Sequence, residues 1–200
     1  MAGKITTNNT NPQDTQINGL FIRLIDDCTG IFIENIAATN LYIDGYSQNS
    51  PNFTGYVRNS IIDKFSYCSH LWRDSMFEIT RNIFNESFSV QPATNGQIDN
   101  ILYYPIIKNN LFLGKMSISY YRNSAPDFPN FLYNTIDINT AYFDSSSTPK
   151  VNFAYNYWCT TDTSLIDEFI IDRNDKLSIM YFVNYLPILQ EKDQLTPLKN

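Results

Sequence analysis

The chain has 200 residues, 43% of them hydrophobic, and a formal net charge of −6. This length suits one domain with a sizeable core. The acidic balance argues against binding to a phosphate backbone and to an anionic membrane surface, both of which require Lys and Arg. We therefore expect no nucleic-acid partner and, because no apolar run is long enough to span a bilayer, no membrane insertion.

The two ends of the chain are polar. The N-terminus has no apolar segment typical of a signal peptide, and no apolar run approaches the ~20 residues of a membrane-spanning helix. We expect a cytoplasmic or virion protein. We divide it into a flexible arm (1–18), one β-rich globular domain (19–187) and a tail (188–200).

The first predicted element is a β-hairpin. Two apolar runs, 20–25 and 31–36, flank the segment Asp26-Asp27-Cys28-Thr29-Gly30. Asp and Gly are typical turn residues, so the runs read as paired antiparallel strands. A short third strand is expected at 40–44.

The hydrophobic period then changes. Apolar residues recur every three or four positions, which predicts a long amphipathic helix near 59–86: Ile61, Phe65, Cys68, Trp72, Met76, Ile79 and Ile83. Ser60 and Asp63 resemble a capping box at its start.

Strand patterns return after Pro92. They predict three further hairpins, made by the pairs of segments 101–107 with 111–121, 131–143 with 151–158, and 168–172 with 177–186. The predicted fold class is therefore α+β, a mainly antiparallel sheet of hairpins packed around one long helix. A β-sandwich or jelly roll with a helical insertion is the alternative. We recognise no internal repeat.

Few residues suggest chemistry. The single histidine, His70, does not share a helical face with Cys68. The cysteines at 28, 68 and 159 are widely spaced and form no Cys-x-x-Cys motif, so we expect thiols in a reducing compartment and no zinc site. Asp26-Asp27, and Asp162 with Asp167 and Glu168, read as solvated carboxylates rather than metal ligands. The sequence thus predicts no catalytic residue, no metal and no cofactor, and leans away from an enzyme.

Aromatic residues occupy both faces of several predicted strands, and aromatic residues are enriched at interfaces. The candidate ligand or interface residues are Trp72, Met76, Tyr120, Tyr155 and Tyr157. The first hypothesis is a non-catalytic structural or assembly subunit, such as a viral or phage virion component, that works in a homo- or hetero-oligomer through protein–protein contacts. The second is a protein or enzyme that binds a small apolar ligand between the helix and a curved sheet.

Overall fold

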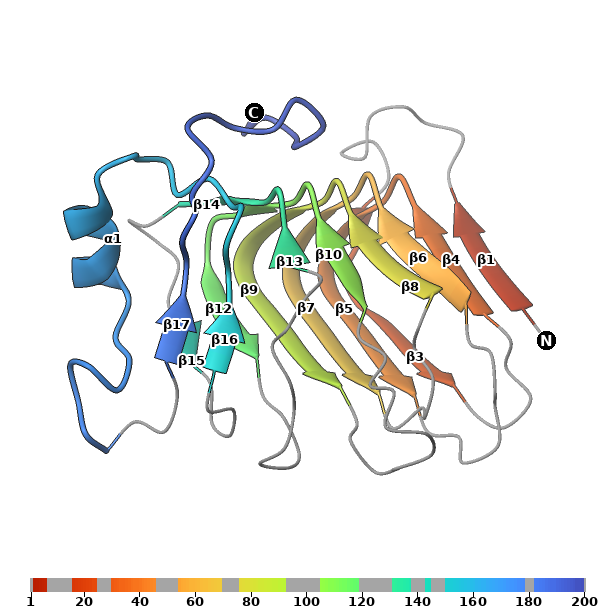
Figure 1. Cartoon of the computed structure of the whole chain (residues 1–200). Helices are drawn as coiled ribbons and strands as arrows, with labels where there is room; N and C mark the ends of the chain where they lie inside the picture. The colour runs from red at the N-terminus through yellow and green to blue at the C-terminus, as the bar shows by residue number, and fades with distance from the viewer. Residues whose placement is uncertain are drawn as a thin grey trace.

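A computed structural model of the chain describes residues 2–6, 16–24, 30–45, 54–69, 76–92, 105–118, 131–137, 143–144, 150–178 and 182–199. The chain winds into a β-solenoid whose successive coils lie side by side (Figure 1). Every strand pairing among the described residues is parallel. The prediction of a β-rich protein is confirmed. The predicted antiparallel sheet around a long helix is wrong, and so is the sandwich alternative.

Two stacked sheets form the walls of the solenoid. Sheet A contains, in spatial order, β1 (Ala2–Thr6), β4 (Gly30–Glu34), β6 (Thr54–Arg58), β8 (Met76–Thr80), β10 (Ile106–Lys108) and β13 (Phe131–Leu132). Sheet B contains β2 (Gln16–Ile17), β3 (Leu20–Leu24), β5 (Ala37–Gly45), β7 (Ile61–Ser69), β9 (Ile83–Pro92), β11 (Leu111–Phe112), β12 (Lys115–Ile118), β14 (Thr135–Ile136) and β15 (Phe143–Asp144).

A smaller unit follows at the C-terminal end. It consists of a two-stranded sheet and one short helix: β16 (Lys150–Asn152), α1 (Thr163–Phe169) and β17 (Phe182–Asn184). The Asp162 carboxylate caps α1 by accepting a hydrogen bond from the Ser164 N–H at 2.9 Å. Part of this segment was predicted as a strand, at 168–172, and that prediction is wrong.

A tight bend joins sheet A to sheet B in five successive coils, and a similar bend follows β16 in the last coil. The first bend residue has a left-handed backbone with φ between 52° and 59°: Asn35, Asn59, Arg81, Asn109, Tyr133 and Tyr155. Asn enters this conformation more readily than most residues, which accounts for part of the Asn content. These positions lie 22 to 28 residues apart in the chain, so the fold has a structural repeat that the sequence did not reveal.

The second bend residue forms a buried ladder along the solenoid. Asn82, Asn110, Asn134 and Asn156 are all fully buried. The side-chain oxygen of each later Asn accepts bonds from both the backbone N–H and the Nδ2 of the Asn one coil earlier, at 2.9–3.1 Å. The ladder satisfies backbone groups that a bend would otherwise leave unpaired inside the protein.

Apolar side chains stack in rows inside the coils. One row of sheet B consists of Leu41, Phe65, Phe88 and Met116, all at most 1% exposed. Aromatic rings continue the stack toward the C-terminal end, with Phe112 and Phe131 5.3 Å apart. The coil interior is thus filled by side chains.

The predicted helix at 59–86 is wrong because its residues form three strands in two successive coils. Residues 61–69 and 83–92 belong to sheet B and 76–80 to sheet A; Trp72 lies outside the described residues. The pairing of β7 with β9 shifts register between Ile62 and Lys64, where β9 has one extra residue, so a strict alternation of apolar residues is interrupted there. Ile62, Phe65 and Tyr67 point to the core on both sides of that irregularity.

The predicted hairpins are wrong for a related reason. The strands on either side of residues 25–29 lie in different sheets, and β3 pairs instead with β5 in parallel. In the same way, Asn109 and Asn110 form a bend between sheets rather than a hairpin turn. The division of the chain at residues 18 and 187 stays a prediction.

Candidate functional site

The structure does not gather the predicted interface residues into one described site. Trp72 and Tyr120 lie outside the described residues, and Met76 begins β8. Tyr155 is 49% exposed at the last bend, whereas Tyr157 is half-buried and its N–H donates to the Asn134 carbonyl at 2.9 Å. Their role as contacts stays a prediction.

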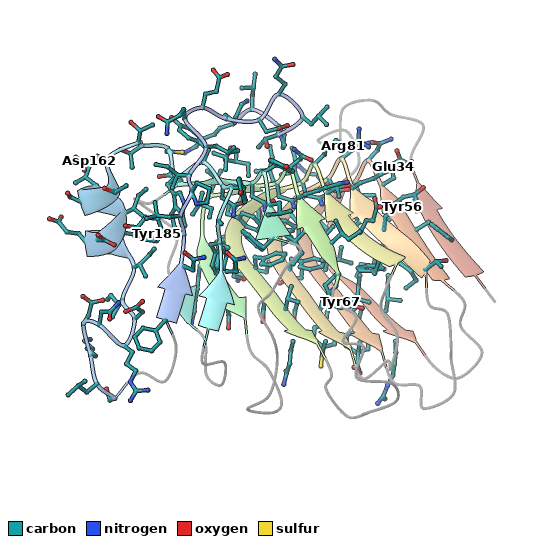
Figure 2. All side chains as sticks on the ribbon, viewed as in Figure 1. Glu34, Tyr56, Tyr67, Arg81, Asp162 and Tyr185 are labelled. Carbon is teal, nitrogen blue, oxygen red and sulfur yellow. The ribbon has the colours of Figure 1, made fainter. Side chains whose placement is uncertain are left out.

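Several of the described titratable groups form contacts within the fold. The Asp167 carboxylate accepts a 2.7 Å hydrogen bond from the Tyr185 hydroxyl, near Asp162 at the start of α1 (Figure 2). Burial raises the pKa of the Cys159 thiol, which lowers its thiolate fraction near neutral pH. Within the described part of the chain, no three His, Cys, Asp or Glu residues are placed to hold a metal ion.

A polar cluster lies on the outer face of sheet A. The Glu34 carboxylate accepts hydrogen bonds from Arg58 at 3.1 Å, Asn59 at 3.3 Å and Tyr56 at 3.4 Å (Figure 2). The Arg58 guanidinium also lies 4.0 Å from the centre of the Tyr56 ring. The hydrogen bond from Arg58 is the main reason why the pKa of Glu34 is lowered. The cluster joins neighbouring coils, and the Glu34 carboxylate is already hydrogen-bonded to side chains of this chain.

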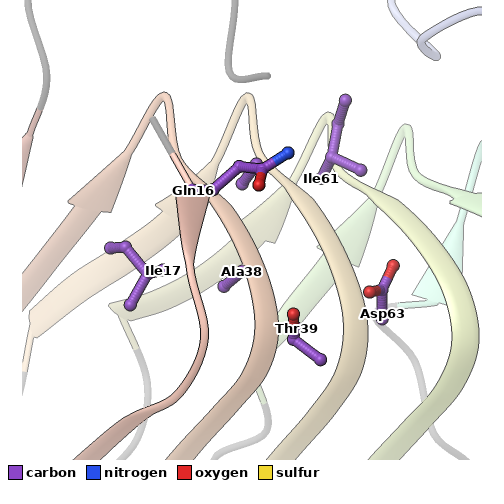
Figure 3. Close-up of a pocket in the computed structure, with 7 residues that line it drawn as sticks. Gln16, Ile17, Ala38, Thr39, Ile61 and Asp63 are labelled. Carbon is purple, nitrogen blue, oxygen red and sulfur yellow. The ribbon is translucent and has the colours of Figure 1, made fainter. Parts of the chain in front are cut away.

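A hollow of about 490 Å³ lies where the outer face of sheet B bends (Figure 3). Its lining residues come from β2, β5 and β7: Gln16, Ile17, Ala37, Ala38, Thr39, Ile61 and Asp63. The Asp63 carboxylate already accepts a hydrogen bond from Asn85 Nδ2 at 2.8 Å. The lining thus offers one carboxylate that is already hydrogen-bonded, so we assign this hollow no reaction.

The C-terminal end of the solenoid is covered. Residues 153–157 form the last coil, and the segment 184–189 bonds to it: Phe153 N–H donates to Asn184 O and Tyr155 N–H donates to Pro187 O, both at 2.6 Å. Trp158 and Ile166 are fully buried. Phe169 and Tyr185 pack edge-on against the Trp158 ring at 6.2 and 6.1 Å. This arrangement closes the core at that end (Figure 1).

The N-terminal end is different. β1 is the terminal strand of sheet A and β3 lies on the outer side of β5 in sheet B, and no described strand pairs with the outer edge of either. Leu20 and Ile22 continue the core rows of Leu41 and Ile43, yet they are only partly buried. We call β1 and β3, with these half-exposed side chains, the open end.

Two outward-facing residues of β3 complete the open end. The Phe21 ring is 64% exposed and stacks on the Tyr42 ring, with centroids 4.8 Å apart and planes at 10°. The Arg23 side chain is 62% exposed, and its Nε lies 3.6 Å from an Asp44 carboxylate oxygen. The sequence showed β3 as an apolar run, but the opening appears only once the strand is placed at the end of the stack.

No helix in the described residues is long and apolar enough to cross a lipid bilayer. No protein-family model, no curated protein and no solved structure matches this chain. The arguments for function therefore come from the geometry of its surfaces.

Proposed function

We propose that this protein is a non-catalytic structural subunit that joins a larger assembly through protein–protein contacts at its open end. A virion is one such assembly. The observation that carries the proposal is the difference between the two ends: Trp158 is fully buried under the C-terminal segment, whereas Leu20 and Ile22 are partly exposed.

An open strand edge is a ready template for another strand, because its N–H and C=O groups lack partners. Repeat proteins generally protect their ends with atypical capping units, as this chain does at its C-terminus. An end that combines a free edge with exposed core side chains is typical of a surface that another protein covers. Binding there would extend both the strand pairing and the core rows.

The alternative function, binding of a small apolar ligand, depended on the predicted long helix. A ligand pocket between a long helix and a curved sheet needs that helix, but residues 61–69, 76–80 and 83–92 are strands. The interior next to them is filled by stacked rings, such as Phe65 and Phe88 at 5.4 Å.

Site-specific photo-crosslinking in the cells that make the protein tests the proposal. A photoreactive phenylalanine analogue is placed at Phe21 and, as the matched control, at Phe182, another exposed aromatic residue on β17 at the covered end. We expect position 21 to give protein adducts that Ile22→Lys abolishes, and position 182 to give few. Equal labelling at both positions, or none at position 21, would refute the proposal.

A further inference from the structure

Resting on the proposed function, we infer that the open end binds a second copy of this chain, head to head. The two β3 strands (Leu20–Leu24) pair antiparallel in a register centred on Ile22. The interface is a closed two-fold contact in which each copy covers the half-exposed core residues of the other.

The covered C-terminal end limits how two copies can meet. A head-to-tail stack would require the open end of one copy to bond to the last coil of another. That coil already donates backbone hydrogen bonds from Phe153 and Tyr155 to residues 184 and 187 of its own chain. Among the described residues, the open end is the place where both walls of the solenoid, β1 in sheet A and β3 in sheet B, end in an unpaired edge. A two-fold contact through these edges uses them in both copies, so it closes after two subunits rather than growing into a fibre.

The alternation of β3 restricts the register. Leu20 and Ile22 face the core, and Phe21 and Arg23 face outward. A register centred on a residue preserves both faces, whereas one centred between residues would place core side chains opposite outward ones. Centring on Arg23 would oppose two like charges. Centring on Phe21 would place Arg23 opposite Gly19, which offers no side chain for Arg23 to contact.

Centring on Ile22 pairs all five residues of the strand. It places Arg23 of each copy directly opposite Phe21 of the other. Phe21 uses one ring face to stack on Tyr42 of the neighbouring strand, which leaves its other face toward the open edge. A guanidinium over that face makes a cation–π contact. This contact occurs twice, once on each side of the two-fold axis.

Charge also favours this arrangement. Arg23 already lies 3.6 Å from Asp44 within its own copy. The guanidinium can keep that ion pair while its planar face meets the incoming ring, because Arg offers both a planar face and several N–H donors. The open end of each copy thus presents both the ring of Phe21 and the guanidinium of Arg23. A two-fold interface requires this kind of self-complementary surface.

Light scattering on the purified full chain, over a range of micromolar concentrations, tests the inference. We expect the mass of a dimer. Ile22→Lys should raise the dimer dissociation constant more than about tenfold, because it sets two ammonium groups at the centre of the interface. Arg23→Gln, at an exposed position that should not disturb folding, should raise it about two- to fivefold. Ser89→Lys on β9, away from the open end, is the control and should leave the mass unchanged.

A monomeric wild-type chain, or a dimer that Ile22→Lys and Arg23→Gln leave intact, overturns the inference. If the isolated chain is monomeric while position 21 still crosslinks to a different protein in cells, the inference fails and the proposed function stands. If position 21 gives no crosslink, both fail.

Disulfide formation tests the register in a variant whose native cysteines are replaced by Ser. Phe21→Cys combined with Arg23→Cys should give a covalent dimer on oxidation, because opposed Cβ atoms in antiparallel strands lie near disulfide range. Neither single variant should do so, and a mixture of the two should. A covalent dimer from Phe21→Cys alone would overturn the register centred on Ile22.

Discussion

Replacing Asn110 with Leu removes the centre of the buried ladder without emptying its space. The Asn110 Nδ2 donates to Ile79 O at 2.8 Å, to Asn134 Oδ1 at 3.0 Å and to Lys108 O at 3.1 Å. Its Oδ1 accepts from the N–H and the Nδ2 of Asn82 at 3.0 and 3.1 Å. Leu has a similar volume and no polar atom, so the change is mainly a loss of hydrogen bonds.

The size of the loss in free energy of unfolding depends on which hydrogen-bonding groups around residue 110 keep another partner. The Asn82 amide still donates to Val57 O, and Asn134 Oδ1 still accepts the backbone N–H of residue 110. The Asn82 backbone N–H and the Ile79 carbonyl each lose a hydrogen bond at a fully buried site. At about 1–3 kcal/mol for each unsatisfied group, Asn110→Leu should lower the free energy of unfolding by about 2–6 kcal/mol.

Equilibrium urea unfolding, followed by circular dichroism, measures this loss. Ser89→Ala, on the half-buried outer row of β9, is the comparison and should change the free energy of unfolding by less than about 0.5 kcal/mol. If the two variants unfold at the same urea concentration, the ladder does not stabilise the fold and the reasoning is refuted.

Three further predictions concern single contacts. The pKa of Glu34 is lowered, first by its hydrogen bond from Arg58, so the carboxylate stabilises the fold above its unfolded pKa and this stability disappears as pH falls through the folded pKa. Glu34→Gln should therefore lose less thermal stability than the wild type on acidification through this range. Burial, then Asp167, raises the pKa of Tyr185 from 10.0 to about 12. The stability tied to its proton is present below pH 10.0 and lost toward about 12, so Tyr185→Phe should flatten alkaline melting curves in that window. A Cβ at Gly114 would meet the backbone carbonyl of Glu86, so Gly114→Ala should lower the free energy of unfolding by about 1–3 kcal/mol, and an unchanged urea midpoint would contradict this.

Several local features could be predicted from the sequence. Apolar runs at 31–36 and 40–44 indicated strands, and β4 and β5 lie there. The left-handed positions at Asn35, Asn59 and Asn109 follow from the ease with which Asn adopts that conformation. Strand alternation identifies which side chains share a face, and that property does not depend on which strand is the neighbour.

The pairing of strands could not be predicted in the same way. A residue such as Asn109 produces a similar local bend whether the next strand turns back beside the last one or enters a second sheet. The partner of Asn110 is Asn134, 24 positions away, so nothing local marks Asn110 as buried. The helix prediction failed for the same reason, since strands that bend around a core can repeat apolar residues at helical spacing.

The amino-acid sequence by itself thus determined the strand-rich character, the acidic charge and the absence of an evident catalytic motif. The tertiary structure alone decided the parallel stacking, the Asn ladder and the contrast between a covered and an open end. The physical reason is that exposure depends on what lies in the neighbouring coil. Ile22 and Ile43 are the same residue type at the same register position, and of the two only Ile43 has a described strand on both sides.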